Sequence, residues 1–334
     1  MKSRNYNIEI MRVLSSIMVI VVHIANYYCE DFGRIIGKQY AFAYFINVCA
    51  RVSVPCFFMI SGALLLDKQE SVKKSIKRCV RYIKVLIIWS VIYYVYNRFF
   101  MGKDIDIKSV FISPTEKHLW YLYVLIPIMM MLPLLQQMCM NMKKEHEVLF
   151  VSLGVWSILI TCLGLEFYYN NSFFGSRPQF VILFFIGHLI NKYKDKIRIS
   201  NKILITVYIT LSLLNTCFGV VMSYIKNAYC KYGTYYINPC IMVSSIAVFI
   251  FIIRMGEGEI QLSKTSEKII DVISKYSFGI YLSHILYLDT IKIILDKVYI
   301  PAYIGIPVSM CVVGGVTLGT VWLMSKVKIV RVII

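Results

Sequence analysis

Long apolar stretches recur along the whole of this 334-residue chain, and they constrain its fold more than any other feature. A transmembrane helix needs about 20 mainly apolar residues to cross a hydrocarbon core of about 30 Å. Stretches that meet or approach this length lie at residues 8–29, 41–66, 82–101, 119–138, 147–165, 178–191, 201–222, 235–254, 276–295 and 303–325. The chain is 58% hydrophobic and 16% charged, whereas soluble domains are about 45–50% apolar and about 25% charged. The sequence therefore predicts an all-α, polytopic membrane protein with ten transmembrane helices.

The distribution of basic residues predicts the orientation of these helices. Connections on the side of the amino terminus carry more than twice as many Lys and Arg residues as those on the other side, and the most basic runs from Lys68 to Lys84. Because cytoplasmic loops carry the excess of basic residues, both termini are expected in the cytoplasm. The net charge of +18 is explained by this asymmetry, and we expect no nucleic-acid partner.

The connections are too short for a separate soluble domain, so residues 1–334 are expected to form one integral-membrane domain. The first apolar stretch lacks a small-residue cleavage site and is interpreted as a retained signal anchor. The ten cysteines include no CxxC pair, and most lie in or beside apolar stretches. We expect them to pack as small apolar side chains rather than to form disulfides or bind a metal.

The first stretch carries a cation and an imidazole, Arg12 and His23. Eleven helical residues rise about 16 Å, so Arg12 is expected near the cytoplasmic face and His23 beyond the bilayer centre. A neutral imidazole can accept a proton from an attacking hydroxyl near neutral pH. The structural alternatives are a histidine that hydrogen-bonds across the bundle and an arginine that reaches the interface or pairs with Glu9.

The second stretch contains Arg51, which the predicted topology places below the outer surface. An unpaired guanidinium is costly there, so a partner or a substrate is expected. Further along, Pro55 frees a backbone carbonyl, and Ser61 with Gly62 permits close helix approach. Arg51 and Ser61 are candidates to contact the acceptor or the transition state, although kinking and packing alone would explain Pro55 and Ser61.

Arg78 and Arg81 lie three residues apart at the cytoplasmic start of the third stretch, on one helical face. Guanidinium groups match phosphate oxygens well, so the pair is a candidate site for a phosphorylated cytosolic cofactor. The alternative is that this basic segment only sets topology or binds anionic lipids.

Further candidates lie at the starts of two later stretches. His118 and Trp120 open the fourth, where aromatic residues are expected as an interfacial belt and can also stack on a sugar acceptor. His284 lies a little over two turns into the ninth, followed by Asp289 and Lys292, which are spaced to pair with each other. We expect no metal site, because no cluster has the spacing of a ligand set.

Together these segments resemble the membrane-bound acyltransferase-3 family, whose members move acyl groups from cytosolic acyl-CoA to extracytoplasmic sugars and cell-envelope polymers. The resemblance is carried by Arg12 with His23, Val54–Gly62, Arg78 with Arg81, His118–Leu122, Phe184–Gly187 and Tyr276–His284. It implies that Arg12 and His23 are required for transfer and that Arg78 and Arg81 face CoA. It also implies a free-standing O-acyltransferase, most simply an acetyltransferase, in a bacterial plasma membrane.

The resulting hypothesis places acyl-CoA on the cytoplasmic side, with its phosphates at Arg78 and Arg81 and its thioester near His23 in one buried chamber. His23 would act as general base on a hydroxyl of a sugar or polysaccharide, or as an acyl carrier. The alternative is a membrane transporter or exporter of polysaccharide or a small amino acid, which would need no CoA.

Overall fold

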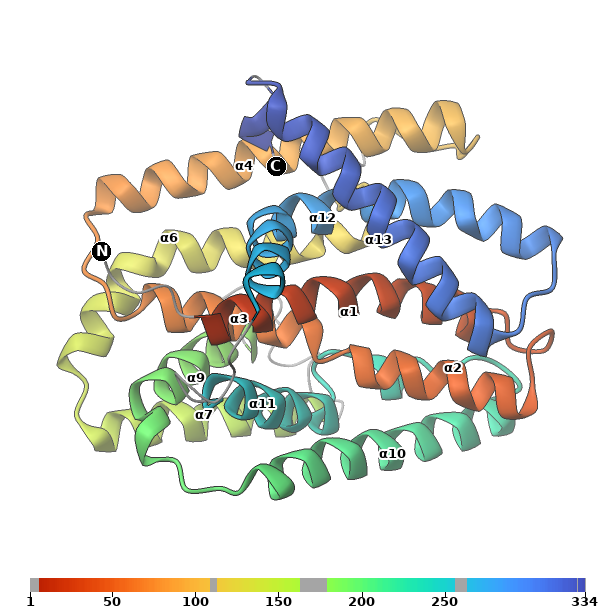
Figure 1. Ribbon diagram of the computed structural model, residues 1–334. Helices are drawn as coiled ribbons and strands as arrows, with labels where there is room; N and C mark the ends of the chain where they lie inside the picture. The colour runs from red at the N-terminus through yellow and green to blue at the C-terminus, as the bar shows by residue number, and fades with distance from the viewer. Residues whose placement is uncertain (1–5, 109–112, 163–178, 256–262, 329, 334) are drawn as a thin grey trace.

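The protein is an all-helical bundle in the computed structural model, which describes residues 6–108, 113–162, 179–255, 263–328 and 330–333 (Figure 1). The described residues contain no β-strand. The α-helices are α1 (Tyr6–Glu30), α2 (Gly37–Ala50), α3 (Ser53–Leu65), α4 (Val72–Val95), α6 (Trp120–Asn141), α7 (Lys144–Cys162), α9 (Gln179–Tyr193), α10 (Asn201–Lys226), α11 (Pro239–Ile253), α12 (Lys264–Lys297) and α13 (Ala302–Lys326). Short helices add Tyr96–Phe100, Lys117–Leu119, Lys194–Lys196, Tyr232–Thr234 and Val330–Ile333.

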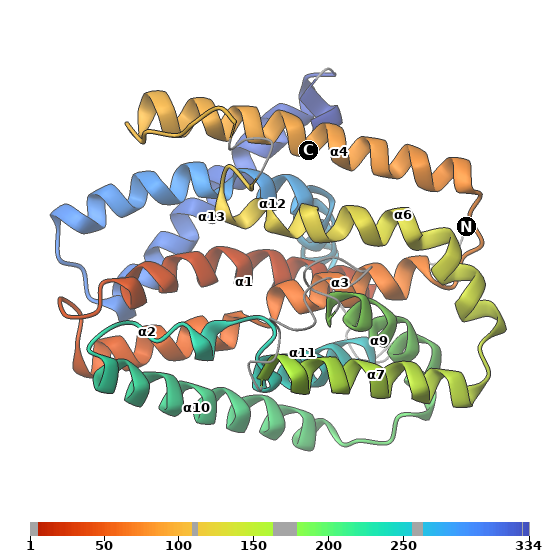
Figure 2. The same cartoon turned by 180° about the vertical axis from the view of Figure 1, so that it is seen from behind.

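Most of these helices run along one common direction, as expected for a membrane bundle (Figures 1 and 2). Among the described residues, eight helical segments are long and apolar enough to cross a membrane. The other two predicted spans correspond to α7 and α9. The 15 residues of α9 rise only about 22 Å at 1.5 Å per residue. We call the end where α1 begins the inner face and the end where α1 finishes the outer face.

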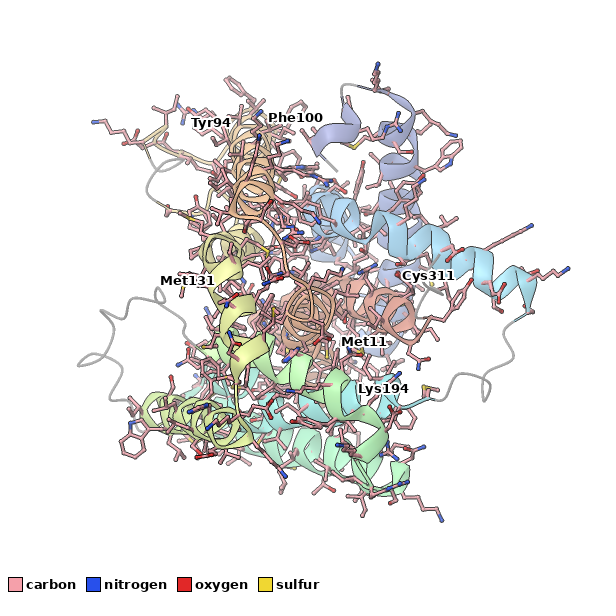
Figure 3. All side chains as sticks on the ribbon, turned by 90° about the vertical axis from the view of Figure 1, so that its left-hand side faces the viewer. Met11, Tyr94, Phe100, Met131, Lys194 and Cys311 are labelled. Atoms are coloured by element: carbon pink, nitrogen blue, oxygen red, sulfur yellow. The ribbon has the colours of Figure 1, made fainter. Side chains whose placement is uncertain are left out.

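Helix α1 occupies the middle of the bundle and packs against α2, α3, α11, α12 and α13. Met11 on α1 is fully buried, whereas Phe100 lies at the perimeter and is 78% exposed (Figure 3). Exposed apolar side chains are frequent on the outward faces of α4, α10 and α13. This distribution is that of a bundle whose perimeter faces lipid and whose centre is protein.

The second predicted span is two helices rather than one. The chain turns at Arg51 and Val52, between α2 and α3. Pro55 lies in the first turn of α3 and lacks the N–H that would bond the carbonyl of Arg51, four residues earlier. The break therefore leaves Arg51 at a helix end inside the bundle, where its side chain is half-buried.

Two glycines let α3 and α9 approach closely. A methyl group added at Gly62 would lie 1.7 Å from the backbone oxygen of Phe184, and one added at Gly187 would lie 2.1 Å from that of Met59. Small residues permit this backbone contact between membrane helices. The close approach expected at Gly62 is confirmed, and it fixes α3 beside the buried helix α9.

The basic segment expected as a connection is largely helical. Helix α4 begins at Val72, because the Ser71 side chain caps it by accepting the N–H of Lys74. The first turns of α4 are charged and extend past the apolar stretch at the inner face. Hydrophobicity alone therefore does not predict that they are helical. The nine cysteines with described side chains are free thiols.

Candidate functional site

Three histidines from distant parts of the chain meet inside the bundle. His23 comes from α1, His118 from the short helix before α6, and His284 from α12. The ring centroids are 5.1 Å apart for His23 and His284, 5.3 Å for His118 and His284, and 6.5 Å for His23 and His118. His118 and His284 are buried, whereas His23 is half-buried. The sequence singled out each of these residues, and the fold brings them together.

Backbone carbonyls determine which nitrogen of two of these rings carries the proton. His284 Nδ1 lies 2.7 Å from the Tyr281 oxygen, and His118 Nε2 lies 3.3 Å from the Leu282 oxygen. A carbonyl only accepts, so these nitrogens are assigned as N–H donors. The other nitrogens, His284 Nε2 and His118 Nδ1, are buried with no hydrogen-bond partner in the described part of the chain. In the neutral rings they are two free proton acceptors beside His23.

His23 lines a cavity of about 330 Å³ that we call the outer cavity. Its wall includes His23, Asn26, Tyr27, Glu30, Arg51, Lys103, Glu116, Lys117, His118, Trp120, Tyr121, Tyr236, Tyr281, Asp289 and Lys292. Cations, carboxylates and aromatic rings all contribute to this lining. Trp120 packs with its ring centroid 5.6 Å from Tyr236 and 5.2 Å from Phe180. Aromatic surfaces with a few polar groups are the usual lining of a small-molecule site.

Arg51 has the partners that its buried position demands. Its Nε donates to Asn47 Oδ1 at 2.8 Å, and its Nη2 donates to Asn26 Oδ1 at 3.4 Å. The guanidinium carbon also lies 4.9 Å from the centroid of the Tyr236 ring. These contacts hold a fixed positive charge in the same cavity as His23.

Asp289 and Lys292 lie on α12, and both contact Tyr27 of α1. The Tyr27 hydroxyl donates to Asp289 Oδ1 at 3.1 Å, and the Lys292 ammonium lies 5.1 Å from the centroid of the Tyr27 ring. Asp289 Oδ2 is buried with no hydrogen-bond partner among the described residues. These residues add a carboxylate acceptor to the outer cavity.

Arg12 and Arg78 line a second hollow, of about 260 Å³, that we call the inner pocket. Ser61, Tyr82, Tyr121 and Tyr281 also line it. Arg12 forms an ion pair of 2.8 Å with Glu9, as the spacing predicted, and donates to the Ser274 hydroxyl at 3.3 Å. The structure thus separates Ser61, in the inner pocket, from Arg51 and His23, in the outer cavity.

Arg78 and Arg81 differ in their surroundings. Arg78 forms an ion pair of 2.8 Å with Glu70, yet its Nη1 is buried with no hydrogen-bond partner in the described part of the chain. Arg81 is exposed on α4 and does not line the inner pocket. A spare guanidinium donor beside a pocket is suited to an incoming anion.

The loop before α4 holds Arg78 through a buried carboxylate. Glu70 has a side chain only 4% exposed, and it also pairs with Lys74 at 3.0 Å. Burial raises the pKa of the Glu70 carboxyl, but the Lys74 and Arg78 cations outweigh burial and hold that pKa below its ordinary value. Glu70 therefore stays ionised and fixes the position of Arg78.

Tyr121 and Tyr281 line both the inner pocket and the outer cavity. Their ring centroids lie 5.3 Å apart in an edge-to-face arrangement, and the Tyr281 hydroxyl donates to the backbone oxygen of His118. We call these two rings the tyrosine wall. The single chamber expected from the sequence is thus two hollows that adjoin at this wall.

The sequence did not single out Glu116, Tyr236 or Tyr82, because their roles depend on the tertiary fold. Glu116 accepts from Asn97 Nδ2 at 3.2 Å and caps the short helix that carries His118. Its position two residues before His118 was the available signal. Among the described residues, no group of three or more His, Cys, Asp and Glu side chains is placed to hold a metal ion.

Comparison with known families gives one match, to the acyltransferase-3 family. The family model, described as "Acyltransferase domain", covers residues 5–326 and so includes nearly the whole chain. No curated protein and no solved structure matches the chain. The match confirms the resemblance carried by the motifs around the outer cavity and the inner pocket.

Proposed function

This chain belongs to the acyltransferase-3 family, and we propose that it transfers an acyl group, most simply acetyl, from cytosolic acyl-CoA to a hydroxyl of an extracytoplasmic sugar or polysaccharide. Family membership identifies it as a membrane acyltransferase. The donor, the acceptor, the residue roles and a location in a bacterial plasma membrane belong to the proposal. The observation that carries it is the pair of hollows that adjoin at the tyrosine wall. Arg12 and Arg78 line one of them, and His23 and His118 line the other.

The inner pocket supports the choice of acyl-CoA as donor. CoA carries phosphates at one end and a thioester at the other, at the tip of a slim arm. The unpartnered Nη1 of Arg78 and the nearby Arg12 offer donors for phosphate oxygens, and Arg81 extends the basic surface along α4. The apolar rings at the end of the pocket suit the arm and the acyl group.

The outer cavity supports a hydroxyl acceptor and proton transfer. In the proposed reaction His23 takes the proton of the acceptor hydroxyl, and the oxygen attacks the thioester carbonyl carbon. The carbon–sulfur bond then breaks, the acyl ester forms, and CoA leaves with the proton. An acyl group carried on His23 is a variant of the same chemistry.

The other polar groups have supporting roles in this mechanism. The acceptor nitrogens of His284 and His118 orient the His23 ring or share its proton. Arg51 supplies positive charge for the oxygen that becomes negative in the transition state, whereas Ser61 lies on the donor side. Trp120 offers a face on which a sugar ring can stack.

The test uses purified protein in vesicles with labelled acetyl-CoA on one side and saccharide acceptors on the other. We expect label in an ester on the saccharide, and we expect CoA to raise the melting temperature of the protein. The alternative function, export of polysaccharide or an amino acid, predicts movement of the solute without CoA. Saccharide transport with no stabilisation by CoA would overturn the transferase assignment.

A further inference from the structure

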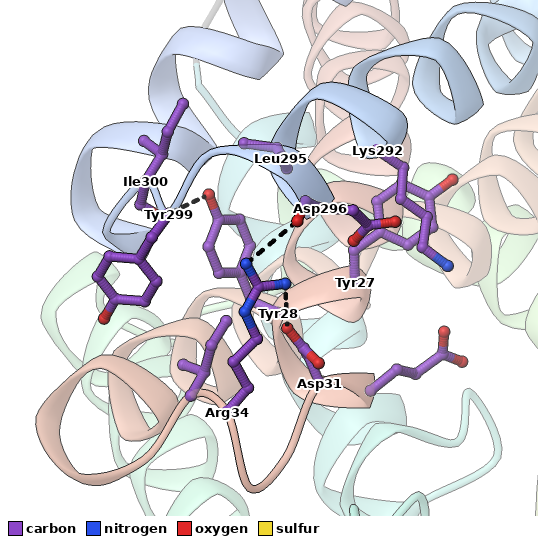
Figure 4. Close-up of a pocket in the computed structure, with 11 residues that line it drawn as sticks. Tyr27, Tyr28, Asp31, Arg34, Lys292, Leu295, Asp296, Tyr299 and Ile300 are labelled. Atoms are coloured by element: carbon purple, nitrogen blue, oxygen red, sulfur yellow. Dashed lines mark hydrogen bonds and ion pairs between the residues drawn. The ribbon is translucent and has the colours of Figure 1, made fainter.

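A third hollow, of about 220 Å³, opens at the outer face between α1 and the connection from α12 to α13 (Figure 4). We call it the outer groove. Its lining includes Tyr27, Tyr28, Glu30, Asp31, Arg34 and Tyr299. It shares Tyr27, Glu30 and Lys292 with the outer cavity, so the two hollows adjoin. The motifs that identify the family do not include this region.

Tyrosine rings dominate the outer groove. In Figure 4 the Tyr28 ring lies between the side chains of Tyr27 and Tyr299. Tyr28 is buried and donates to the backbone oxygen of Ile300 at 3.2 Å, which fixes its ring in place. Tyr299 is 54% exposed and leaves a ring face available at the mouth of the groove. Tyrosine combines an apolar face with a polar edge, and both features match a sugar.

The outer groove is lined by three carboxylates and two cations, a net charge of −1 that disfavours an anion. The carboxylates are those of Glu30, Asp31 and Asp296, and the cations are Arg34 and Lys292. The Arg34 guanidinium lies 3.5 Å from Asp31 Oδ2 and donates to the backbone oxygen of Asp296 at 3.2 Å. The side-chain carboxylates of Glu30 and Asp296 have no ion-pair or hydrogen-bond partner in the described part of the chain. Free carboxylates accept hydrogen bonds from hydroxyls and repel phosphates and uronates.

We propose that the outer groove binds a neutral sugar unit of the acceptor next to the unit that is acylated in the outer cavity. The acceptor is then a neutral oligosaccharide or polysaccharide of at least two units. A pocket for a drug-sized ligand has about 300–1,000 Å³, so the 220 Å³ of the groove suits one ring. The inference rests on the proposed function for the identity of the acceptor, but binding can be measured without transfer.

The experiment measures the affinity of purified protein for neutral homo-oligosaccharides of one to four hexose units, without acyl-CoA, by calorimetry. The panel contains glucose, galactose, mannose and N-acetylglucosamine series, with galacturonate oligomers as the anionic comparison. We expect at least one neutral series to gain about tenfold in affinity between one and two or more units. Galacturonate oligomers are expected to bind more weakly than the neutral series.

Variants at the groove mouth test whether this gain arises there. Tyr299→Ala should abolish the gain with length, and Tyr299→Phe should retain it because the ring remains. Tyr303→Ala is the matched control, since Tyr303 is 55% exposed on α13 and does not line the groove. Thermal unfolding of each variant verifies that it is folded.

Three results would overturn the inference: no gain with length in any neutral series, stronger binding of galacturonate, or a gain that persists in Tyr299→Ala. Failure of the proposed function is distinguishable from all three. If the gain with length and its loss in Tyr299→Ala are observed but no acetyl group is transferred, the groove stands and the reaction does not.

Discussion

The inner pocket and the outer cavity lie on either side of the same two tyrosines, yet their polar groups are arranged differently. In the inner pocket the cations are already paired inside the protein, Arg12 with Glu9 and Arg78 with Glu70. In the outer cavity His118 Nδ1 and Asp289 Oδ2 are buried with no hydrogen-bond partner among the described residues. The same holds for His284 Nε2, on the ring that packs against His23. One region holds its charges in place, and the other leaves proton acceptors open.

This difference suits the inner pocket to binding of the proposed donor and the outer cavity to the proposed proton transfer. Paired guanidinium groups keep a fixed geometry and present their remaining N–H groups to an anion, which suits a phosphorylated donor. Unpaired acceptors inside a protein are costly unless a ligand supplies the missing donors, which suits an acceptor rich in hydroxyls. Variants on each side should therefore fail in different ways.

The largest expected effect is at His23. His23→Ala removes the proposed base and should lower the transfer rate by about 10²–10⁴-fold, with little change in CoA affinity, because His23 does not line the inner pocket. Labelled acetyl transfer and calorimetry with CoA measure the two quantities. His146→Ala is the matched control, since this exposed histidine lies on α7 outside both hollows. Transfer at the wild-type rate by His23→Ala would disprove the base assignment.

The next effect distinguishes the two arginines of α4. Arg78→Ala should weaken CoA binding by about 10–100-fold, the range for a lost hydrogen bond to a charged group. Arg81→Ala should weaken it less, because Arg81 is exposed and outside the inner pocket. Lys73→Ala, an exposed cation on the same helix, controls for general charge. Equal losses for all three variants would mean that only the overall positive charge matters.

A smaller effect is expected at the tyrosine wall, where the two regions adjoin. Tyr281→Leu replaces the ring by a smaller aliphatic side chain. It should raise the rate of acetyl-CoA hydrolysis without an acceptor by a few-fold, because water can then reach the thioester. Tyr281→Phe keeps the ring and should stay near the wild-type rate of hydrolysis. The measurement is release of free CoA in the absence of saccharide. Equally fast hydrolysis in Tyr281→Phe and Tyr281→Leu would show that the hydroxyl, which both variants lack, and not the ring separates the hollows.

The smallest effect concerns stability rather than rate. The depressed pKa of Glu70 means that its ion pairs stabilise the fold fully above the ordinary carboxyl pKa of about 4.3, and that this stabilisation is lost as the pH falls through the lower folded-state value. Glu70→Gln should lower stability by about 1 kcal/mol at neutral pH. It should also reduce the decline at acid pH.

Asp67 belongs to the same loop and provides a parallel case for that comparison. The imidazole of His188, 3.0 Å from Asp67 Oδ1, and the nearby Asn191 lower the pKa of this carboxyl. Asp67→Asn should likewise reduce the decline in stability at acid pH, because the pKa of Asp67 is also lowered in the folded protein. Thermal unfolding as a function of pH measures both variants, and a Glu70→Gln curve parallel to wild type would contradict the role assigned to Glu70.

The local sequence predicted most of the helices, because a helix that crosses a membrane must itself be apolar over most of its length. The stretch at 8–29 became α1 (Tyr6–Glu30), and the one at 303–325 became α13 (Ala302–Lys326). The predicted helix boundaries are wrong where a helix extends beyond its apolar stretch. The first turns of α4 are basic and belong to the helix all the same, since Ser71 caps it there.

The candidate site was harder to predict, because its arrangement depends on contacts between distant helices. Composition and spacing identified His23, His118 and His284 one at a time, but only the crossing of three helices brings the rings within 7 Å of one another. The aromatic residues at the start of the fourth stretch were expected in an interfacial belt, but Tyr121 in that segment is buried between the two hollows. The sequence pattern predicts which face of a helix is buried, but it does not predict which helix packs against that face.

The tyrosine wall has a consequence for the cell as well as for the reaction. Hollows that enter a membrane protein from opposite faces shorten the insulating path between two aqueous compartments. Moving one elementary charge through a potential of 100 mV yields about 2.3 kcal/mol, so any wetted route would conduct ions or protons down their gradient. The packed rings of Tyr121 and Tyr281 lie where the two hollows adjoin, and so on any such route between them. In the proposed enzyme, the contact between these rings would therefore also limit leakage of ions across the membrane.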